Sequence, residues 1–131
     1  MMADSIYREL ILEHNKNPQN RGTLDPADFT YQDTNPLCGD EVRIDVRVAD
    51  DKISEIAFSG RGCAISQASA SILTELVKGQ PLDEVKSFSK DDLLDELGIP
   101  LSPARLKCAL LSLKVLKAGL YGVNVAEEVW Q

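Results

Sequence analysis

The segment 41–49 alternates apolar and polar residues along its whole length, and a period of two is typical of a β-strand. The apolar set is Val42, Ile44, Val46 and Val48, and the polar set between them is Arg43, Asp45 and Arg47. We expect the apolar set to face a core and the polar set to face solvent, as in an antiparallel sheet with one covered face.

A second strand is predicted directly after this one. Residues 50–52 form a polar turn, and residues 53–59 return with Ile56 and Phe58 facing inward, although their pattern fixes the register less clearly. Residues 60–62, Gly-Arg-Gly, interrupt that strand. A short strand at residues 29–32 would bring the sheet to about three strands.

The remaining periodic segments predict helices. Residues 5–16 end before Pro18, residues 64–78 end at Gly79, and Ser102 with Pro103 begins a long apolar helix that extends to about residue 120. Shorter helices are expected from residue 81, at residues 90–97 and at residues 124–131. The 131 residues, 44% of them apolar, suffice for one domain spanning 1–131.

The net negative charge argues against polyanionic partners. The chain carries 14 basic and 21 acidic residues, a formal charge of −7, which disfavours nucleic acid and anionic membrane surfaces. No apolar run approaches the ~20 residues that cross a bilayer, and the polar start lacks the features of a secretory signal. We therefore expect a cytoplasmic protein.

The three cysteines lie at the boundaries of predicted elements. Cys38 precedes the strand 41–49, Cys63 lies between a strand and a helix, and Cys108 lies in the early turns of the last long helix. A free cysteine often packs as a small core residue, and an odd number does not suggest a disulfide framework. Boundary positions instead favour a site assembled at one rim of the fold.

The residues around these cysteines favour thiolates and a bound cation. Cys63 precedes a helix N-terminus, Arg105 and Lys107 flank Cys108, and Asp40 lies two residues from Cys38. Three thiolates and one carboxylate make a plausible four-coordinate site for zinc or for an iron–sulfur cluster, with Arg105 and Lys107 as supporting charge. The cysteines are 25 and 45 residues apart, which matches no short metal motif.

Three segments, residues 35–40, 60–71 and 102–108, resemble the ligand motifs of the IscU/SufU family, the NifU N-terminal-like proteins of iron–sulfur cluster assembly. Residues 7–22 and 77–84 are also similar to that family. The resemblance implies an α+β fold, a small antiparallel sheet with helices packed on one face. It also implies the metal ligands Cys38, Asp40, Cys63 and Cys108. His14, the only histidine, is interpreted as a packing residue.

The resemblance implies a scaffold that takes sulfur from a cysteine desulfurase, builds a labile cluster and transfers it to apo acceptor proteins. The expected occupant of the site is a [2Fe–2S] cluster or iron, with zinc as the alternative. The scaffold itself is not an enzyme, and Cys38 and Cys108 are the candidate persulfide acceptors. The alternative is a zinc-dependent sulfurtransferase that relays the sulfur.

Two departures keep both alternatives open. Lys107 stands where the IscU branch has a histidine, as in the SufU branch, yet the chain lacks the extra segment usual in SufU between the second and third cysteines. Residues 101–105 match only part of the proline-rich segment by which IscU proteins engage a heat-shock chaperone, so that partner also stays open.

Overall fold

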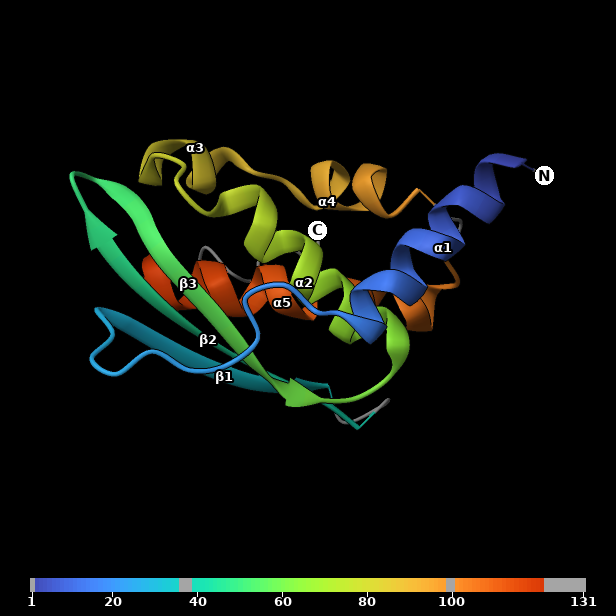
Figure 1. Ribbon diagram of the computed structural model, residues 1–131, viewed down its shortest axis with the longest axis horizontal. Helices are drawn as coiled ribbons and strands as arrows, with labels where there is room; N and C mark the ends of the chain where they lie inside the picture. The colour runs from blue at the N-terminus through green and yellow to red at the C-terminus, as the bar shows by residue number, and fades with distance from the viewer. Residues whose placement is uncertain (1, 36–38, 99–100, 122–131) are drawn as a thin grey trace.

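A three-stranded antiparallel sheet forms one layer of the protein in the computed structural model, which describes residues 2–35, 39–98 and 101–121, with side chains from residue 8 onward (Figure 1). Strands β1 (Phe29–Asn35), β2 (Asp40–Ala49) and β3 (Lys52–Arg61) lie in the order β1-β2-β3. The predicted α+β class with about three strands is confirmed, although β1 is longer than predicted and β3 continues through Gly60 to Arg61.

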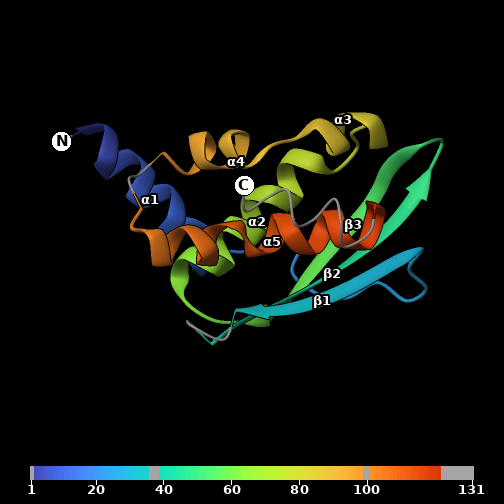
Figure 2. The ribbon, with the colours of Figure 1, turned by 180° about the vertical axis from the view of Figure 1, so that it is seen from behind.

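Five helices form the second layer of the described chain. They are α1 (Met2–Lys16), α2 (Ala64–Val77), α3 (Leu82–Ser87), α4 (Lys90–Leu97) and α5 (Pro103–Tyr121). Figures 1 and 2 show them gathered on one side of the sheet, where α5 contacts β1 and β2, α2 contacts β3, and α1 contacts α2. The helix predicted at 124–131 lies outside the described residues. None of the described helices is long and apolar enough to cross a membrane.

A bulge explains why the sequence of β3 did not fix its register. Val46 pairs with Ile56, but Val48 pairs with Ile53, so β3 carries one extra residue, Ser54. The bulge turns both Ile53 and Ile56 into the core, where their exposed fractions are 0% and 3%. Strict alternation would have placed these two side chains on opposite faces.

Asp45 corrects the expectation that the polar residues of β2 face solvent, because its exposed fraction is 1%. Its carboxylate accepts hydrogen bonds from the backbone N–H of Leu24 (3.0 Å), the hydroxyl of Thr30 (2.8 Å) and Nε of Arg43 (3.1 Å). The bond from Leu24 attaches the segment before β1 to the outer face of the sheet. Burial raises the pKa of Asp45, but the three donors outweigh it and leave this pKa below its usual value.

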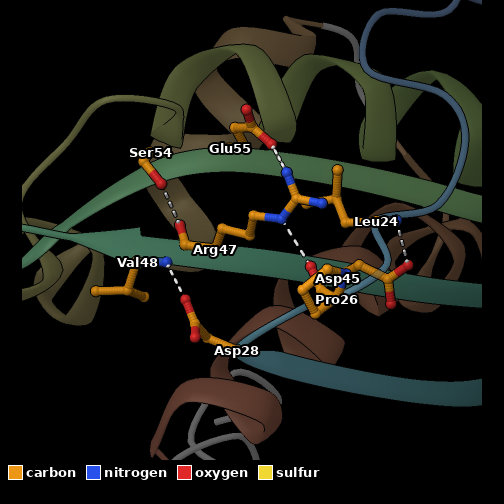
Figure 3. Close-up of polar contacts among 8 residues, drawn as sticks. All are labelled: Leu24, Pro26, Asp28, Asp45, Arg47, Val48, Ser54 and Glu55. Atoms are coloured by element: carbon orange, nitrogen blue, oxygen red, sulfur yellow. Dashed lines mark hydrogen bonds and ion pairs between the residues drawn. The ribbon is translucent and has the colours of Figure 1, made fainter.

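The same outer segment is held at two further points (Figure 3). Nε of Arg47 donates to the carbonyl of Pro26 (2.7 Å), and the backbone N–H of Val48 donates to the carboxylate of Asp28 (2.6 Å). Arg47 also pairs with Glu55 on β3. Polar residues on this face therefore bind a loop that the period-two pattern does not reveal.

His14 joins α1 to α2, which agrees with its interpretation as a packing residue. Its exposed fraction is 8%, and its Nδ1 lies 2.6 Å from Oγ of Ser71. The same hydroxyl oxygen accepts the backbone N–H of Gln19 (2.8 Å). The end of α1 and the turn after it are thus fixed against α2, the helix that follows Cys63.

Candidate metal centre

Asp40, Cys63 and Cys108 meet at one end of the sheet, although they come from three different elements. Asp40 begins β2, Cys63 lies between β3 and α2, and Cys108 lies in the second turn of α5. One carboxylate oxygen and the two sulfur atoms all lie within 4.8 Å of one another. The fourth predicted ligand, Cys38, lies outside the described residues.

Asp40 is fully buried and is oriented by the backbone of Cys63. Its Oδ1 accepts the backbone N–H of Cys63 (2.8 Å), while its Oδ2 lies 3.8 Å from the sulfur of Cys63. Gly62 leaves room for this carboxylate, because a Cβ there would lie 2.2 Å from Oδ1. One oxygen is thus engaged, and the other faces the thiol.

Cys63 is the N-cap residue of α2, as its position before a helix predicted. Its backbone is extended, and its sulfur accepts the backbone N–H of Ser66 (3.5 Å). The free amides at a helix N-terminus favour negative charge on that sulfur. Cys63 is only partly buried, so of the three side chains it is the one open to solvent.

Cys108 is fully buried between α5 and the end of β1. Its thiol lies 3.6 Å from the carbonyl of Ala104, one turn earlier in α5, and its sulfur lies 3.9 Å from Nδ2 of Asn35. Asn35, the last residue of β1, is directly paired with Asp40 on β2. The sequence reasoning did not single out Asn35, although it lies in the motif of residues 35–40.

The two predicted charge-balancing residues do not reach this cluster through any contact of the described chain. Arg105 and Lys107 are exposed on α5, and neither side chain forms an ion pair or hydrogen bond within residues 8–35, 39–98 and 101–121. Lys107 instead lines a groove between α4 and α5, beside Leu94 and Leu106. Their role as supporting charge stays a prediction.

The donor set fits the metals that the sequence suggested. Ligands at ~2.0–2.3 Å from a tetrahedral zinc lie about 3.3–3.8 Å apart, and the spacing of the Asp40 oxygen and the Cys63 sulfur, 3.8 Å, is at the upper end of this range. Two sulfurs and one oxygen leave a fourth position for Cys38 or for an exchangeable ligand. Thiolates also suit iron–sulfur clusters, so this geometry alone does not choose between zinc and a cluster.

Residues 6–126 match the family described as "NifU-like N terminal domain". The chain belongs to this family, the IscU/SufU class of iron–sulfur cluster assembly proteins, which confirms the family expected from its motifs. The structure also superposes on a candidate iron–sulfur cluster assembly scaffold protein for the SUF system from Fervidobacterium islandicum. That match has a TM-score of 0.77 and 28% identity, and it covers 90% of this chain and 98% of that one.

Curated relatives come from both branches. The chain is 37% identical to "Zinc-dependent sulfurtransferase SufU" of Bacillus subtilis, covering 89% of this chain and 90% of the relative. It is 35% identical to "Iron-sulfur cluster assembly scaffold protein IscU" of Escherichia coli, covering 87% of this chain and 91% of that relative. The SufU alignment has 134 positions, more than the 131 residues of this chain, so that relative has residues without a counterpart here.

Proposed function

We propose that this protein is a scaffold on which an iron–sulfur cluster, [2Fe–2S] in its first stable form, is assembled and then passed to apo acceptor proteins. The observation that supports the proposal is the convergence of Asp40, Cys63 and Cys108 within 4.8 Å. In this proposal Cys38 completes the ligand set, and the protein works in the cytoplasm with a cysteine desulfurase as its sulfur source.

The mixed donor set suits a site that must release its cargo. Thiolates bind iron strongly, whereas a carboxylate is a harder ligand that suits a soft site less well. Asp40 supplies that weaker bond through Oδ2, because its Oδ1 already accepts the backbone N–H of Cys63. Loss of one cluster bond at Asp40 would therefore leave the protein framework in place while an acceptor thiolate takes over.

Sulfur delivery needs a thiolate of this chain as nucleophile. The thiolate attacks the outer sulfur of the desulfurase persulfide, the sulfur–sulfur bond of that persulfide breaks, and the desulfurase cysteine leaves as thiolate. Release of the sulfur as sulfide then requires two electrons from a reductant. Cys38 and Cys108 remain the candidate acceptors, and because Cys108 is fully buried, transfer to it requires local opening of the structure around it.

A zinc-dependent sulfurtransferase is the second candidate function. Lys107 at the position before Cys108 and the 37% identity to the Bacillus subtilis SufU favour it. In this proposal zinc would be held by the same residues and would keep the thiolates deprotonated. The chain itself would orient Asp40 and expose Cys63 in the same way.

Anaerobic reconstitution separates the two proposals. The protein is incubated with a cysteine desulfurase, cysteine, iron and a thiol reductant, with and without added zinc. A scaffold develops the visible absorption of a cluster and passes it to an apo-ferredoxin, and zinc suppresses this. A sulfurtransferase forms no transferable cluster and stimulates the desulfurase only when zinc is bound. If neither result is obtained, both proposals fail.

A further inference from the structure

The side-chain amide of Asn35 is the polar group of β1 that reaches the metal-ligand cluster. Its exposed fraction is 8%, and its Nδ2 lies 3.9 Å from the sulfur of Cys108. Directly opposed residues of an antiparallel pair place their side chains on the same face, so Asn35 and its partner Asp40 both face α5. We propose that Asn35 is a positioning residue that donates an amide N–H to the Cys108 sulfur; this rests on the proposed metal-binding function.

Binding a metal changes what the sulfur of Cys108 needs from its surroundings. As a thiol, it donates its proton toward the carbonyl of Ala104 at 3.6 Å. As a metal-bound thiolate, it has no proton and can only accept. The carbonyl of Ala104 is an acceptor and cannot form a hydrogen bond with a thiolate, whereas the amide of Asn35 can donate an N–H.

The other two members of the cluster already have such a donor from the backbone. The backbone N–H of Cys63 donates a hydrogen bond to the carboxylate of Asp40, and the backbone N–H of Ser66 donates one to the sulfur of Cys63. Cys108 lies inside a helix, where the backbone N–H groups bond to carbonyls of the preceding turn. A side chain from another element can supply a donor to this sulfur, and Asn35 on β1 is placed to do so.

An uncharged donor suits this position better than a cation would. A buried anionic sulfur without a hydrogen bond is costly, and a donated N–H reduces that cost without changing the total charge of the bound metal or cluster. Hydrogen bonds to cysteine sulfur also weaken its electron donation to the metal, which tunes potential and bond strength. Asn35 would therefore set both the orientation and the donor strength of Cys108.

β1 supplies a matched control. Asp33 lies two residues before Asn35, so its side chain is on the same face, and its carboxylate lies 3.2 Å from Nζ of Lys114 on the same helix as Cys108. Asp33→Asn weakens the contact between β1 and α5 without touching the sulfur. A purely structural role of Asn35 would be imitated by this variant, whereas a role at the sulfur would not.

The experiment compares the wild type, Asn35→Leu, Asn35→Asp and Asp33→Asn as full-length chains. Cobalt(II) is titrated into each, the sulfur-to-cobalt charge-transfer band is recorded, and zinc affinity is measured by competition. We expect the band of Asn35→Leu to move to longer wavelength and its zinc affinity to fall roughly tenfold, as for other groups that hydrogen-bond to a metal ligand. Asn35→Asp presents an oxygen to the sulfur, and its zinc affinity should fall further than that of Asn35→Leu. Asp33→Asn should have the band position and zinc affinity of the wild type.

Two results would overturn the proposal. One is a wild-type band and affinity in both Asn35 variants, and the other is the same change in Asp33→Asn. Far-UV circular dichroism checks folding, and if Asn35→Leu does not fold, the near-isosteric Asn35→Asp decides the test. If the wild type itself binds neither cobalt nor zinc, the proposed metal site fails rather than the role of Asn35.

Discussion

The carboxylate of Asp40 contacts Cys63 twice, through a 2.8 Å hydrogen bond to the backbone N–H and through a 3.8 Å approach to the sulfur. Asp40 thus has a structural role at the start of α2 in addition to its proposed role as a ligand. The two roles use different oxygens, so different substitutions can separate them.

Asp40→Ala removes both roles, whereas Asp40→Asn keeps an oxygen for the N–H of Cys63. We expect Asp40→Ala to lose about 1 kcal/mol of unfolding free energy because the part-buried N–H of Cys63 loses its acceptor, and Asp40→Asn to lose less. In a scaffold, Asp40→Ala should retain its cluster longer and transfer it more slowly, because the exchangeable ligand is gone. In a zinc sulfurtransferase, it should bind zinc more weakly.

Urea unfolding, cluster transfer to apo-ferredoxin and zinc competition measure these three quantities. Faster cluster loss from Asp40→Ala together with unchanged zinc affinity would show that Asp40 is not a ligand in either case.

Gly62→Ala should disturb the site far more than the same change at Gly22. Both glycines have positive φ angles, +147° and +143°, so each substitution introduces backbone strain of about 1–3 kcal/mol. Only at Gly62 would the new Cβ overlap Asp40, 2.2 Å from Oδ1, whereas nothing lies within 4 Å at Gly22. Thermal unfolding and zinc titration should show weakened metal binding in Gly62→Ala alone; equal zinc affinity in the two variants would contradict this.

The two described cysteines should differ in reactivity. Cys63 is partly exposed and caps α2, whereas Cys108 is fully buried. In the metal-free protein we expect iodoacetamide to alkylate Cys63 at least about tenfold faster than Cys108, because modification of Cys108 requires local opening. Time-resolved peptide mass spectrometry measures both rates in one sample, with the urea-unfolded chain as the control. Equal rates in the folded protein would contradict the difference in burial between the two cysteines.

Acid should destabilise the protein partly through Asp45. The pKa of this carboxyl is lower in the folded state than its ordinary value of 3.8, so the ionised form stabilises the fold above that pH. The stabilisation is lost as pH falls from 3.8 through the lower folded pKa. Urea unfolding at pH values between 7 and 3 should show a smaller acid-dependent loss for Asp45→Asn than for the wild type. An identical pH dependence would mean that the outer loop does not depend on this charge.

Metal removal should lower stability without unfolding the protein. The sheet, α2 and α5 enclose an extensive buried apolar core, unlike the small core of a zinc finger, so we expect the chain to fold without a metal. Zinc at about 100 times its dissociation constant should add about 2.7 kcal/mol and raise the melting temperature. Calorimetry with zinc or with a chelator checks this, and a chelated sample that is unfolded at room temperature would refute it.

The sequence by itself determined the elements of this fold, because their signals are local. The alternation in residues 41–49 gave β2, and the capping residues Gly98 and Ser102 marked the end of α4 and the start of α5. The motifs around Asp40, Cys63 and Cys108 indicated the family and the candidate ligands before any contact was known.

Only the tertiary structure decided which neighbours complete the site and which polar residues are buried. Asn35 and Cys108 are 73 residues apart, and their contact depends on how α5 packs against β1, which no periodicity along the chain encodes. Asp45 was predicted to face solvent because alternation reports only the two faces of a strand, not a loop that later covers one of them. The supporting charge of Arg105 and Lys107 was likewise inferred from adjacency to Cys108, and neither side chain has a contact to the cluster in the part of the chain that the structure describes, so that role stays a prediction.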